Sequence, residues 1–448
     1  MISGKAAMTS LFGHSIRSQT FLLTITDVLA VFAFVFALVA LTANTPDHTA
    51  FAAAATIAFG VALSAILVGG AVGLYRPEAA NGLRHRVISG LTGSALLLVL
   101  IAALLSLGSA GGPVTLTLQL MLAVLSGAVV AMMLTRLGQA TFARTSGRIA
   151  VVGDAEAAAL RTRYHPYEVT LALPQASTLE AALAAGRLKA WRVDTVVWAD
   201  AAPLPGTLRA HCAAAGLRVL TRAEFAELGQ NKVDLDALPD GWLASARAAR
   251  TSVGEAALRR GFDIAVGLSI LIFTLPLLLL AMVAIRLDGP GPIFYRQERV
   301  GAGNRPFTLF KFRSMVVDAE RGGAPKWATR ADPRVTRVGR FLRLTRIDEI
   351  PQILNVLRGD MSVVGPRPER PAFVEQLATI IPHYNDRAVV KPGITGWAQV
   401  SFPYGASVED SRRKLEYDLY YVRRRSLFLD LLILLATVRV VLFQEGAR

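Results

Sequence analysis

Four long apolar segments fill the first third of the chain. They comprise residues 21–41, 50–74, 87–107 and 114–134, each 21 to 25 residues long, and Asp27 is the one charged residue within them. A helix needs about 20 residues to cross the hydrocarbon core of a bilayer. The sequence therefore predicts four transmembrane helices in a bundle over residues 1–146, and it argues against a wholly water-soluble fold.

Basic residues in the connecting segments set the expected orientation of this bundle. Loops 42–49 and 108–113 contain no Lys or Arg, whereas the other flanking segments contain Lys5, Arg17, Arg76, Arg84, Arg86, Arg136, Arg144 and Arg148. Because cytoplasmic loops are enriched in Lys and Arg, the N-terminus and the domain after residue 146 are expected in the cytoplasm. Asp27 lies near the cytoplasmic end of the first segment and is interpreted as a polar contact rather than a proton relay.

The composition agrees with a membrane protein and leaves the charged partner open. Charged residues make up 18% of the chain, against about 25% in soluble proteins, and the mean hydropathy is +0.44. The single cysteine, Cys212, excludes a disulfide framework and a Cys-rich zinc site. The net charge of +15 indicates a nucleic acid, an anionic lipid or a phosphate-bearing substrate, or merely an Ala- and Arg-rich coding bias.

Residues 147–245 are expected to form a small Rossmann-like α/β domain. Strand candidates at 148–152, 193–198 and 217–220 alternate with helix candidates at 179–188 and 208–215, which is typical of a parallel sheet. A dinucleotide-binding fingerprint needs three glycines where this chain has Gly153, Ala155 and Ala158. A regulatory or scaffolding module is therefore favoured over a nucleotide site.

The apolar segment 262–285 admits two topologies. Pro276 lies near its middle, and a proline breaks or kinks a helix, leaving halves of about 12 residues that are too short to span the bilayer core. Arg259, Arg260 and Arg286 place positive charge at both ends. The local sequence fits equally a helix that enters and leaves one leaflet and a fifth crossing with a kink.

Candidate catalytic and phosphate-binding residues are concentrated in the segment 287–448. A hairpin is predicted over residues 293–312, with Lys311 and Arg313 near its end. A basic series then recurs every third residue, and on one helix it would form a drifting face suited to phosphates: Arg334, Arg337, Arg340, Arg343 and Arg346. Asp348 and Glu349 follow directly, and paired carboxylates beside cations can supply a nucleophile on phosphorus and its partner.

Two stiff loops lie further along the chain. Pro-Arg-Pro at residues 366–368 restricts the backbone around Arg367, which would present a preorganised phosphate clamp. The loop at residues 391–399 contains Trp397 and Gln399 between glycines and a proline.

Taken in order, these motifs resemble a known family. The run TRIDEIPQILNVLRGDMSVVGPRPE at 345–369, together with KFRSM at 311–315, DPRVTRVGRFLR at 332–343 and PGITGWAQV at 392–400, resembles the catalytic core of the bacterial polyprenyl-phosphate hexose-1-phosphate transferases, the monotopic phosphoglycosyl transferases. The resemblance extends from residue 258 to the C-terminus. The layout resembles the large subfamily, and the ending PYGASVED…KLEYDLYY resembles the branch associated with exosortase and exopolysaccharide systems.

The resemblance implies a reaction and a set of residue roles. Asp348, with Glu349 as its partner, would attack the β-phosphate of a UDP-sugar, UMP would leave, and undecaprenyl (polyprenyl) phosphate would take the sugar phosphate to begin exopolysaccharide or glycoconjugate synthesis. Mg²⁺, with Asp348 as a ligand, would help to neutralise the diphosphate. Arg343 and Arg367 match phosphate-binding positions, and motif positions of less defined role are Lys311, Arg313, Gln399 and Asp418.

The resemblance also implies an arrangement at the bacterial inner membrane. Residues 246–286 would be a linker and a re-entrant membrane helix broken at Pro276, and residues 287–448 a cytoplasmic α+β catalytic domain. The family often has Ser-Pro at the break, whereas this chain has Leu275-Pro276. The implied partners are the UDP-sugar, polyprenyl phosphate, the lipid membrane and, by analogy, a second copy of the chain, but no nucleic acid. The alternative is a membrane sensor or scaffold with a ligand-binding α/β domain and an inactive transferase domain.

Overall fold

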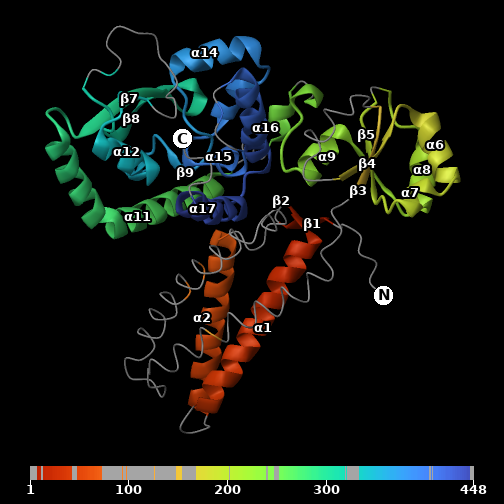
Figure 1. The fold of residues 1–448 in the computed structure, drawn as a ribbon, viewed down its shortest axis with the longest axis horizontal. Coiled ribbons are helices and arrows are strands. Elements are labelled where there is room, and N and C mark those ends of the chain that lie inside the picture. The colour runs from red at the N-terminus through yellow and green to blue at the C-terminus, as the bar shows by residue number, and fades with distance from the viewer. Residues whose placement is uncertain are drawn as a thin grey trace. The chain divides into compact units, whose positions relative to one another are not determined.

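The structure is a computed structural model, and it forms two compact units that are described one at a time (Figure 1). One unit comprises residues 1–11 and 15–230, and the other comprises residues 12–14 and 231–448. The described residues are 8–11, 14–42, 48–72, 93, 97, 126, 148–153, 168–200, 202–238, 241–246, 252–317, 319, 332–402, 405 and 407–443.

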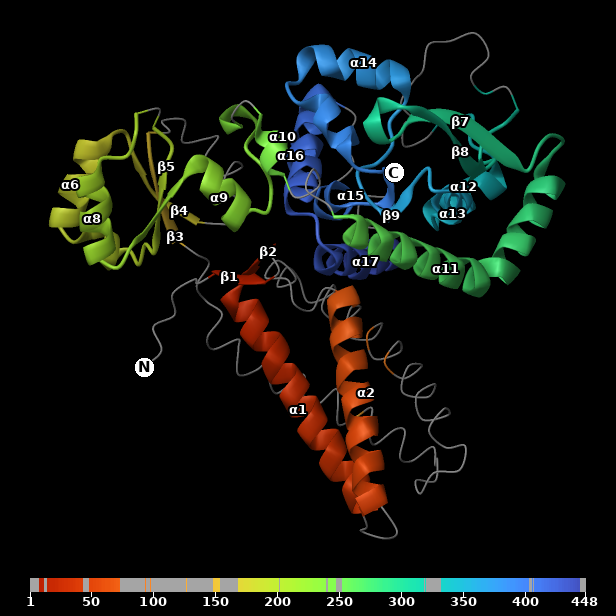
Figure 2. The same ribbon diagram turned by 180° about the vertical axis from the view of Figure 1, so that it is seen from behind.

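Two long apolar helices lie side by side in the first unit (Figure 2). They are α1 (Ser18–Thr42) and α2 (His48–Val72), and the rings of Phe36 and Phe51 meet between them with centroids 6.4 Å apart. Two short strands, β1 (Met8–Leu11) and β2 (His14–Arg17), precede α1.

These helices coincide with the first two predicted membrane segments. The segment 51–71 of α2 is long and apolar enough to cross a membrane, and so is helix α11 of the second unit. Helix α1 contains a shorter apolar segment. Asp27 is buried. The predicted segments 87–107 and 114–134 lie outside the described residues apart from single positions, so the four-helix bundle stays a prediction.

A four-stranded parallel sheet forms the rest of the first unit. Its strands are β3 (Arg148–Val152), β4 (Glu168–Leu173), β5 (Thr195–Trp198) and β6 (Arg218–Thr221), in the order β4-β3-β5-β6. Helices α6 (Ala176–Ala184), α7 (Arg187–Ala190) and α8 (Gly206–Ala214) lie on one side of the sheet, and α9 (Arg222–Gly229) lies on the other (Figure 1). Alternate strand residues supply the two cores, because successive side chains point to opposite faces.

The predicted α/β domain with a parallel sheet is confirmed, with one strand added. β4 was not among the strand candidates, although its sequence EVTLAL alternates as a strand would. Gly153 follows β3 with φ +89°, and a Cβ there would lie 2.5 Å from the backbone nitrogen of Asp200. This glycine is therefore required by the close approach of two loops, whatever the domain binds. Ala155 and Ala158 lie outside the described residues.

The second unit combines helices with short strands. The predicted hairpin is confirmed as antiparallel β7 (Phe294–Val300) and β8 (Pro306–Phe312). The remaining elements are η2 (Leu235–Ala237), α10 (Trp242–Ser245), α11 (Val253–Asp288), η4 (Ala302–Asn304), α12 (Arg337–Leu344), η5 (Ile347–Gln352), α13 (Ile353–Arg358), β9 (Ser362–Val364), α14 (Pro371–Ile380), η6 (Tyr384–Val389), β10 (Gly393–Thr395), α15 (Trp397–Ser401), α16 (Val408–Arg424) and α17 (Leu427–Leu442).

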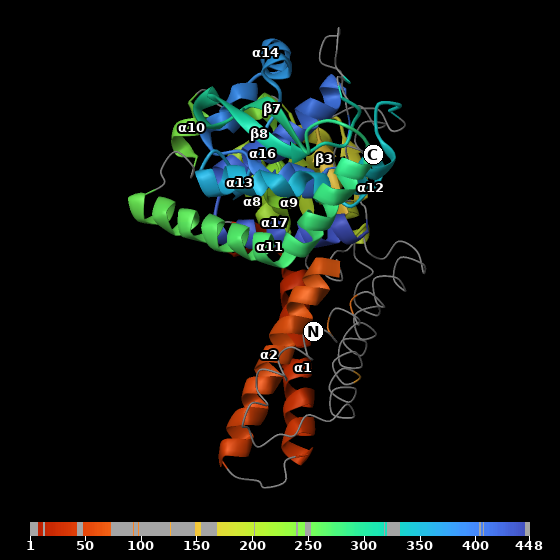
Figure 3. The ribbon, with the colours of Figure 1, turned by 90° about the vertical axis from the view of Figure 1, so that its left-hand side faces the viewer.

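Helix α11 is bent, and both of its limbs pack against the rest of the second unit (Figures 2 and 3). In the first limb, Asp263 accepts hydrogen bonds from Ser362 Oγ at 2.8 Å and from the Val363 amide at 2.9 Å. In the second limb, three apolar residues join the core formed with β8, α12 and η5: Leu278, Ala281 and Ile285. Pro276 lies between the two sets of contacts, inside a helix that continues through it.

The expected break at Pro276 is thus a bend in one continuous helix. A proline removes one backbone hydrogen bond and presses on the preceding turn, which bends a helix when the neighbouring turns keep their bonds. The hydroxyl of Thr274 donates to the Ile270 carbonyl at 2.7 Å, so it serves its own turn.

The main core of the second unit begins earlier in the chain than the motifs suggest. It gathers α16, α17, β9 and α14 around the buried rings of Tyr420 and Tyr421, and it includes Val233, Trp242 and Ala246. Residues 231–246, assigned from sequence partly to the α/β domain and partly to a linker, therefore belong to the second unit.

Candidate active site

The acidic pair Asp348 and Glu349 occupies the first turn of η5, directly after α12. Arg346 precedes the pair with φ 59°, a left-handed conformation that turns the chain between the two helices. Both carboxylates are buried, with 7% and 9% of their surface exposed. Such burial is costly for charged groups unless cations or hydrogen bonds compensate it.

Two cations converge on one oxygen of Glu349. Lys311 Nζ, from the end of β8, lies 2.7 Å from Glu349 Oε1, and Arg367 Nη2 lies 2.8 Å from the same atom. Burial alone would raise the pKa of Glu349, but Arg367, Lys311 and Arg346 outweigh burial and hold that pKa well below its ordinary value. Glu349 is therefore a fixed anion that holds a lysine and an arginine in place.

Asp348 is held differently from its neighbour. Within the part of the chain that the structure describes, its Oδ1 is buried and accepts no hydrogen bond. Burial, helped by the negative charge of Glu349, raises the pKa of Asp348 to about 6, against the opposing effect of Lys311, Arg346 and Arg343. Asp348 is thus ionised at neutral pH, more basic than an ordinary aspartate, and has an oxygen available to a ligand.

The basic series does not lie on one helix, so that prediction is wrong. Thr336 caps α12 through a 2.9 Å hydrogen bond from the Gly339 amide, so the helix begins only at Arg337. Arg334 precedes it and pairs with Asp332 at 2.5 Å, and Arg346 follows the helix in its left-handed turn. The end of the series, Arg343 and Arg346, is what reaches the electrostatic environment of Asp348.

The two stiff loops form one structure that presents Arg367. The Gly365 amide donates to the Thr395 carbonyl and the Gly393 amide donates to the Pro366 carbonyl, both at 2.9 Å. The backbones are so close that a Cβ on Gly393 would lie 2.1 Å from the Gly365 nitrogen. Only glycine permits this contact, which fixes the backbone on both sides of Pro-Arg-Pro.

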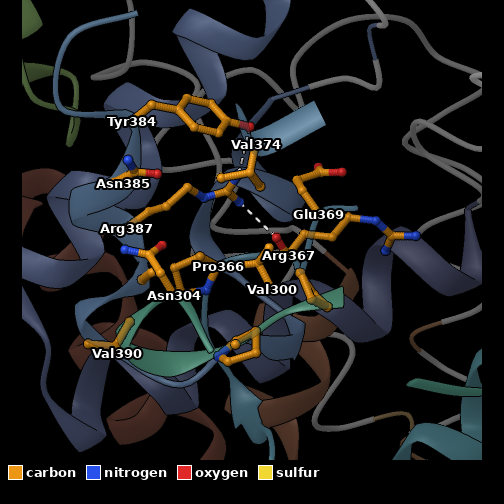
Figure 4. A pocket seen from close by; sticks show the side chains of 14 residues that line it. Val300, Asn304, Pro366, Arg367, Glu369, Val374, Tyr384, Asn385, Arg387 and Val390 are labelled. Carbon is orange, nitrogen blue, oxygen red and sulfur yellow. Dashed lines mark hydrogen bonds between the residues drawn. The ribbon is translucent and has the colours of Figure 1, made fainter. Parts of the chain in front are cut away.

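A pocket opens beside Arg367 (Figure 4). Arg387 lies across it, with Nη2 donating to the Arg367 carbonyl at 2.8 Å and Nη1 donating to Tyr384 Oη at 3.1 Å. Asp418 of α16 pairs with Arg387 Nη2 at 2.8 Å. The lining mixes apolar and polar groups, including Val300, Asn304, Pro366, Arg367, Glu369, Val374, Tyr384, Asn385, Arg387 and Val390.

The structure sorts the residues proposed from sequence into two groups. One group surrounds the acidic pair: Lys311, Arg343 and Arg367 with Asp348 and Glu349. The other residues serve elsewhere. Arg313 donates to the Ile285, Gly289 and Pro290 carbonyls and so caps α11. Gln399 Nε2 bonds the Ile394 carbonyl, and Asp418 supports Arg387 from behind the pocket.

Several lining residues were missed by the sequence reasoning. Arg387, Tyr384 and Glu369 lie around the pocket, yet the segment that contains the first two has no recognisable spacing of charged or glycine residues. The one available signal was Glu369, which directly follows Pro-Arg-Pro.

A divalent metal is compatible with this site, with substrate phosphates and waters as further ligands. The described residues contain no group of three or more His, Cys, Asp or Glu side chains placed to hold a metal ion. Mg²⁺ is commonly held by one or two carboxylates together with substrate phosphates and waters. The uncommitted Oδ1 of Asp348 fits that requirement.

Comparison with known proteins gives one family match inside the second unit and several similar relatives. The model of the family described as "Bacterial sugar transferase" matches residues 254–444. A UDP-N-acetylgalactosamine-undecaprenyl-phosphate N-acetylgalactosaminephosphotransferase of Aeromonas hydrophila is 44% identical over 239 residues, which cover 53% of this chain and 56% of the relative. A UDP-glucose:undecaprenyl-phosphate glucose-1-phosphate transferase of Xanthomonas campestris pv. campestris is 47% identical over 174 residues, covering 38% of this chain and 36% of the relative.

A shorter relative is covered almost completely. An uncharacterized sugar transferase of Bacillus subtilis is 40% identical over 193 residues, which represent 42% of this chain and 89% of that protein. The chain otherwise spans about half of the Aeromonas relative and about a third of the Xanthomonas relative.

Proposed function

The chain belongs to the bacterial sugar transferase family, and from this premise we propose that it transfers a sugar 1-phosphate from a UDP-sugar to undecaprenyl phosphate. The observation that carries the proposal is a desolvated Asp348, with a free Oδ1, beside a glutamate clamped by Lys311 and Arg367. The names of the relatives support both substrate classes, since they specify UDP-N-acetylgalactosamine, UDP-glucose and undecaprenyl phosphate.

The proposed reaction proceeds in two displacements at one phosphorus atom. A carboxylate oxygen of Asp348 bonds to the β-phosphorus, the bond from that phosphorus to the bridging oxygen breaks, and UMP leaves with the electron pair. An oxygen of undecaprenyl phosphate then attacks the same phosphorus, and the bond to Asp348 breaks. The product is undecaprenyl-diphospho-sugar, and Asp348 is regenerated as a carboxylate.

The surrounding charges suit a diphosphate. Lys311, Arg343, Arg346 and Arg367 place four positive charges against the two carboxylates, which leaves an excess of two for an anionic ligand. Arginine binds phosphate oxygens with its planar fork, so Arg343 and Arg367 are proposed to bind the donor. If Mg²⁺ takes part, Asp348 would hold it, and the ion would supply further charge neutralisation.

We also propose that the pocket beside Arg367 takes the nucleotide part of the donor. Arg367 connects the pocket with the acidic pair, since it lines the pocket and donates to Glu349 at 2.8 Å. Its mixture of apolar walls with Asn304, Tyr384 and Asn385 is typical of a pocket for a small, partly planar ligand.

Helix α11 is proposed to be a re-entrant membrane helix, which enters and leaves the same leaflet. Both limbs of this helix pack on the same unit, whereas a helix that crossed the bilayer would carry its second limb to the opposite side. Its outer face exposes large apolar side chains, with Ile272, Phe273 and Leu280 each more than 60% exposed. Such a face is suited to lipid, and the apolar helices support association of the chain with a membrane.

The decisive experiment follows UMP release by the purified full-length protein. Undecaprenyl phosphate is combined with a panel of UDP-sugars that includes UDP-glucose and UDP-N-acetylgalactosamine. Asp348→Asn should reduce turnover by more than about a hundredfold, because it removes the nucleophile and keeps the shape, and mass spectrometry should detect a phosphosugar on wild-type protein alone. Glu349→Gln should also be severely impaired, whereas Glu375→Gln, on the exposed surface of α14, is the matched control. UMP release by Asp348→Asn at near the wild-type rate would disprove the covalent role.

A further inference from the structure

Residues 231–246 form a segment, here called the strap, that precedes the region matched by the family model. That region begins at residue 254, and the strap directly follows α9 of the parallel-sheet domain. Four strap residues are nevertheless buried in the core of the second unit: Val233, Leu235, Trp242 and Ala246. The strap is thus an integral part of the fold that holds the acidic pair.

The first half of the strap is bonded to α16. Lys232 Nζ pairs with Glu416 at 2.9 Å, and the Val233 amide donates to the Glu416 carbonyl at 3.0 Å. Tyr420 Oη donates to Asn231 Oδ1 at 3.0 Å. These partners lie on both sides of Asp418 along α16, so the strap is fastened to the helix that carries this aspartate.

The second half of the strap is bonded to η6. Trp242 Nε1 donates to Asp386 Oδ2 at 2.8 Å, and His383 Nδ1 lies 3.0 Å from the same oxygen. The rings of Trp242 and His383 meet edge to face with centroids 6.4 Å apart. The indole is 3% exposed, so its position is well defined by packing, and Asp386 directly precedes Arg387.

The strap therefore holds the two elements whose residues pair behind the pocket. Asp418 comes from α16 and Arg387 from η6, and their 2.8 Å ion pair places the guanidinium that contacts the Arg367 carbonyl and Tyr384. No other segment between the parallel-sheet domain and α11 is described that could make these contacts.

We propose that the strap is a positioning element of the donor pocket, and that Trp242 is a positioning residue that acts through Asp386 on Arg387. The proposal rests on the proposed function, since it concerns the pocket assigned to the UDP-sugar. It predicts that this enzyme needs residues outside the family's common region to bind its donor well. The strap also follows the parallel-sheet domain directly in the chain, and both of its halves are bonded to elements of the second unit.

The test uses the full-length protein with Trp242→Phe, which keeps an aromatic ring and removes the N–H donor. We expect the KM for the UDP-sugar to rise about fivefold or more, the size of effect expected for one lost hydrogen bond. The kcat and the KM for undecaprenyl phosphate should change less than about twofold, because the acidic pair is untouched. The Kd of UDP should rise by the same factor as the KM for the UDP-sugar.

Three controls separate positioning from loss of folding. Trp191→Phe makes the same chemical change at a 46% exposed tryptophan of the other unit and should leave all constants unchanged. Asp386→Ala should raise the donor KM at least as much as Trp242→Phe, because it also removes the contact with His383. Trp242→Phe should add little in the Asp386→Ala background, where its hydrogen-bond partner is already gone. Asp386→Asn keeps an acceptor oxygen and should restore the donor KM to within about twofold of wild type.

The outcomes distinguish this proposal from the proposed function. An unchanged donor KM in Trp242→Phe and in Asp386→Ala, with Asp348→Asn inactive, would overturn the strap proposal alone. Equal effects on the donor KM, acceptor KM and kcat would also overturn it, as they would indicate a general structural role. If the wild-type protein released no UMP from any UDP-sugar, the proposed function itself would fail.

Discussion

Arg387 Nη2 lies 2.8 Å from Asp418 Oδ2 and donates at 2.8 Å to the carbonyl of Arg367. One guanidinium thus joins a buried aspartate of α16 to the backbone of Pro-Arg-Pro. Burial raises the pKa of Asp418 to about 6, against the effect of Arg387, so the pair is charged at neutral pH. This relationship gives Asp418 a supporting place behind the pocket.

Asp418→Asn should both destabilise the protein and weaken donor binding. Removing one partner of a buried ion pair leaves the other charge uncompensated, which costs about 3 kcal/mol in the free energy of unfolding. We expect a lower thermal midpoint and a raised KM for the UDP-sugar. The exposed Glu375→Gln serves as the control, and a variant with both values unchanged would contradict the supporting role.

Arg367→Lys should reduce kcat/KM by about tenfold or more, roughly 1.4 kcal/mol. Lysine keeps the charge but loses the planar fork that can bond Glu349 and a phosphate together. Steady-state kinetics of UMP release measure the effect. Arg209→Lys, at an exposed position of α8, should behave as wild type, and wild-type kinetics in Arg367→Lys would remove this arginine from the site.

Activity and stability should respond to pH in opposite directions between about 4 and 6. The pKa of Asp348 is raised from 3.8 to about 6 by burial and Glu349, with Lys311, Arg343 and Arg346 opposing. Only the carboxylate can attack phosphorus, so kcat/KM should fall as the pH drops through about 6, approaching tenfold per unit.

The sign for stability follows from proton binding. In this window the folded Asp348 keeps a proton that the unfolded chain has released, so its contribution to the free energy of unfolding falls as the pH rises. The Asp348→Asn variant should lose that part of the pH dependence of its thermal midpoint. A flat kcat/KM profile from pH 5 to 8 would contradict the assignment of the nucleophile.

Gly393→Ala should disrupt the loop that presents Arg367. The added Cβ would lie 2.1 Å from the Gly365 nitrogen, so backbone must move and the hydrogen bond to the Pro366 carbonyl must lengthen. We expect loss of at least about 2 kcal/mol of stability and a lower kcat/KM. Gly206→Ala, where no atom lies within 4 Å of the new Cβ, should be nearly neutral. Equal behaviour of the two variants would show that the contact is not tight.

Both ends of α11 should lie on the cytoplasmic side of the membrane. Cysteines placed singly at Val253 and Asp288, in a Cys212→Ser background, can be treated with an impermeant maleimide in intact spheroplasts. Both positions are exposed on the isolated unit and should be labelled only after the membrane is opened. Labelling of Asp288→Cys from outside would indicate a full crossing.

The sequence by itself determined whatever depends on neighbours in the chain. The long apolar runs predict membrane segments, because length and hydrophobicity are local properties. The hairpin, the adjacent carboxylates and the stiffness of Pro-Arg-Pro likewise follow from consecutive residues, whereas the roles proposed for Asp348 and Arg367 come from the resemblance to the family. The basic series misled because periodicity cannot show where a helix is capped, and here Thr336 and Arg346 limit α12 to eight residues.

Only the tertiary structure decided which distant residues share the site. Arg387 of η6 forms an ion pair with Asp418 of α16, and Trp242 donates a hydrogen bond to Asp386, 144 residues away in the sequence. No spacing or motif in the sequence predicts either pair. The bend of α11, with both limbs on one unit, also depends on packing against β8, α12 and α13, since the proline itself allows a kinked crossing as well. Such contacts arise when the chain buries its core, and that process brings together residues whose positions in the sequence are unrelated.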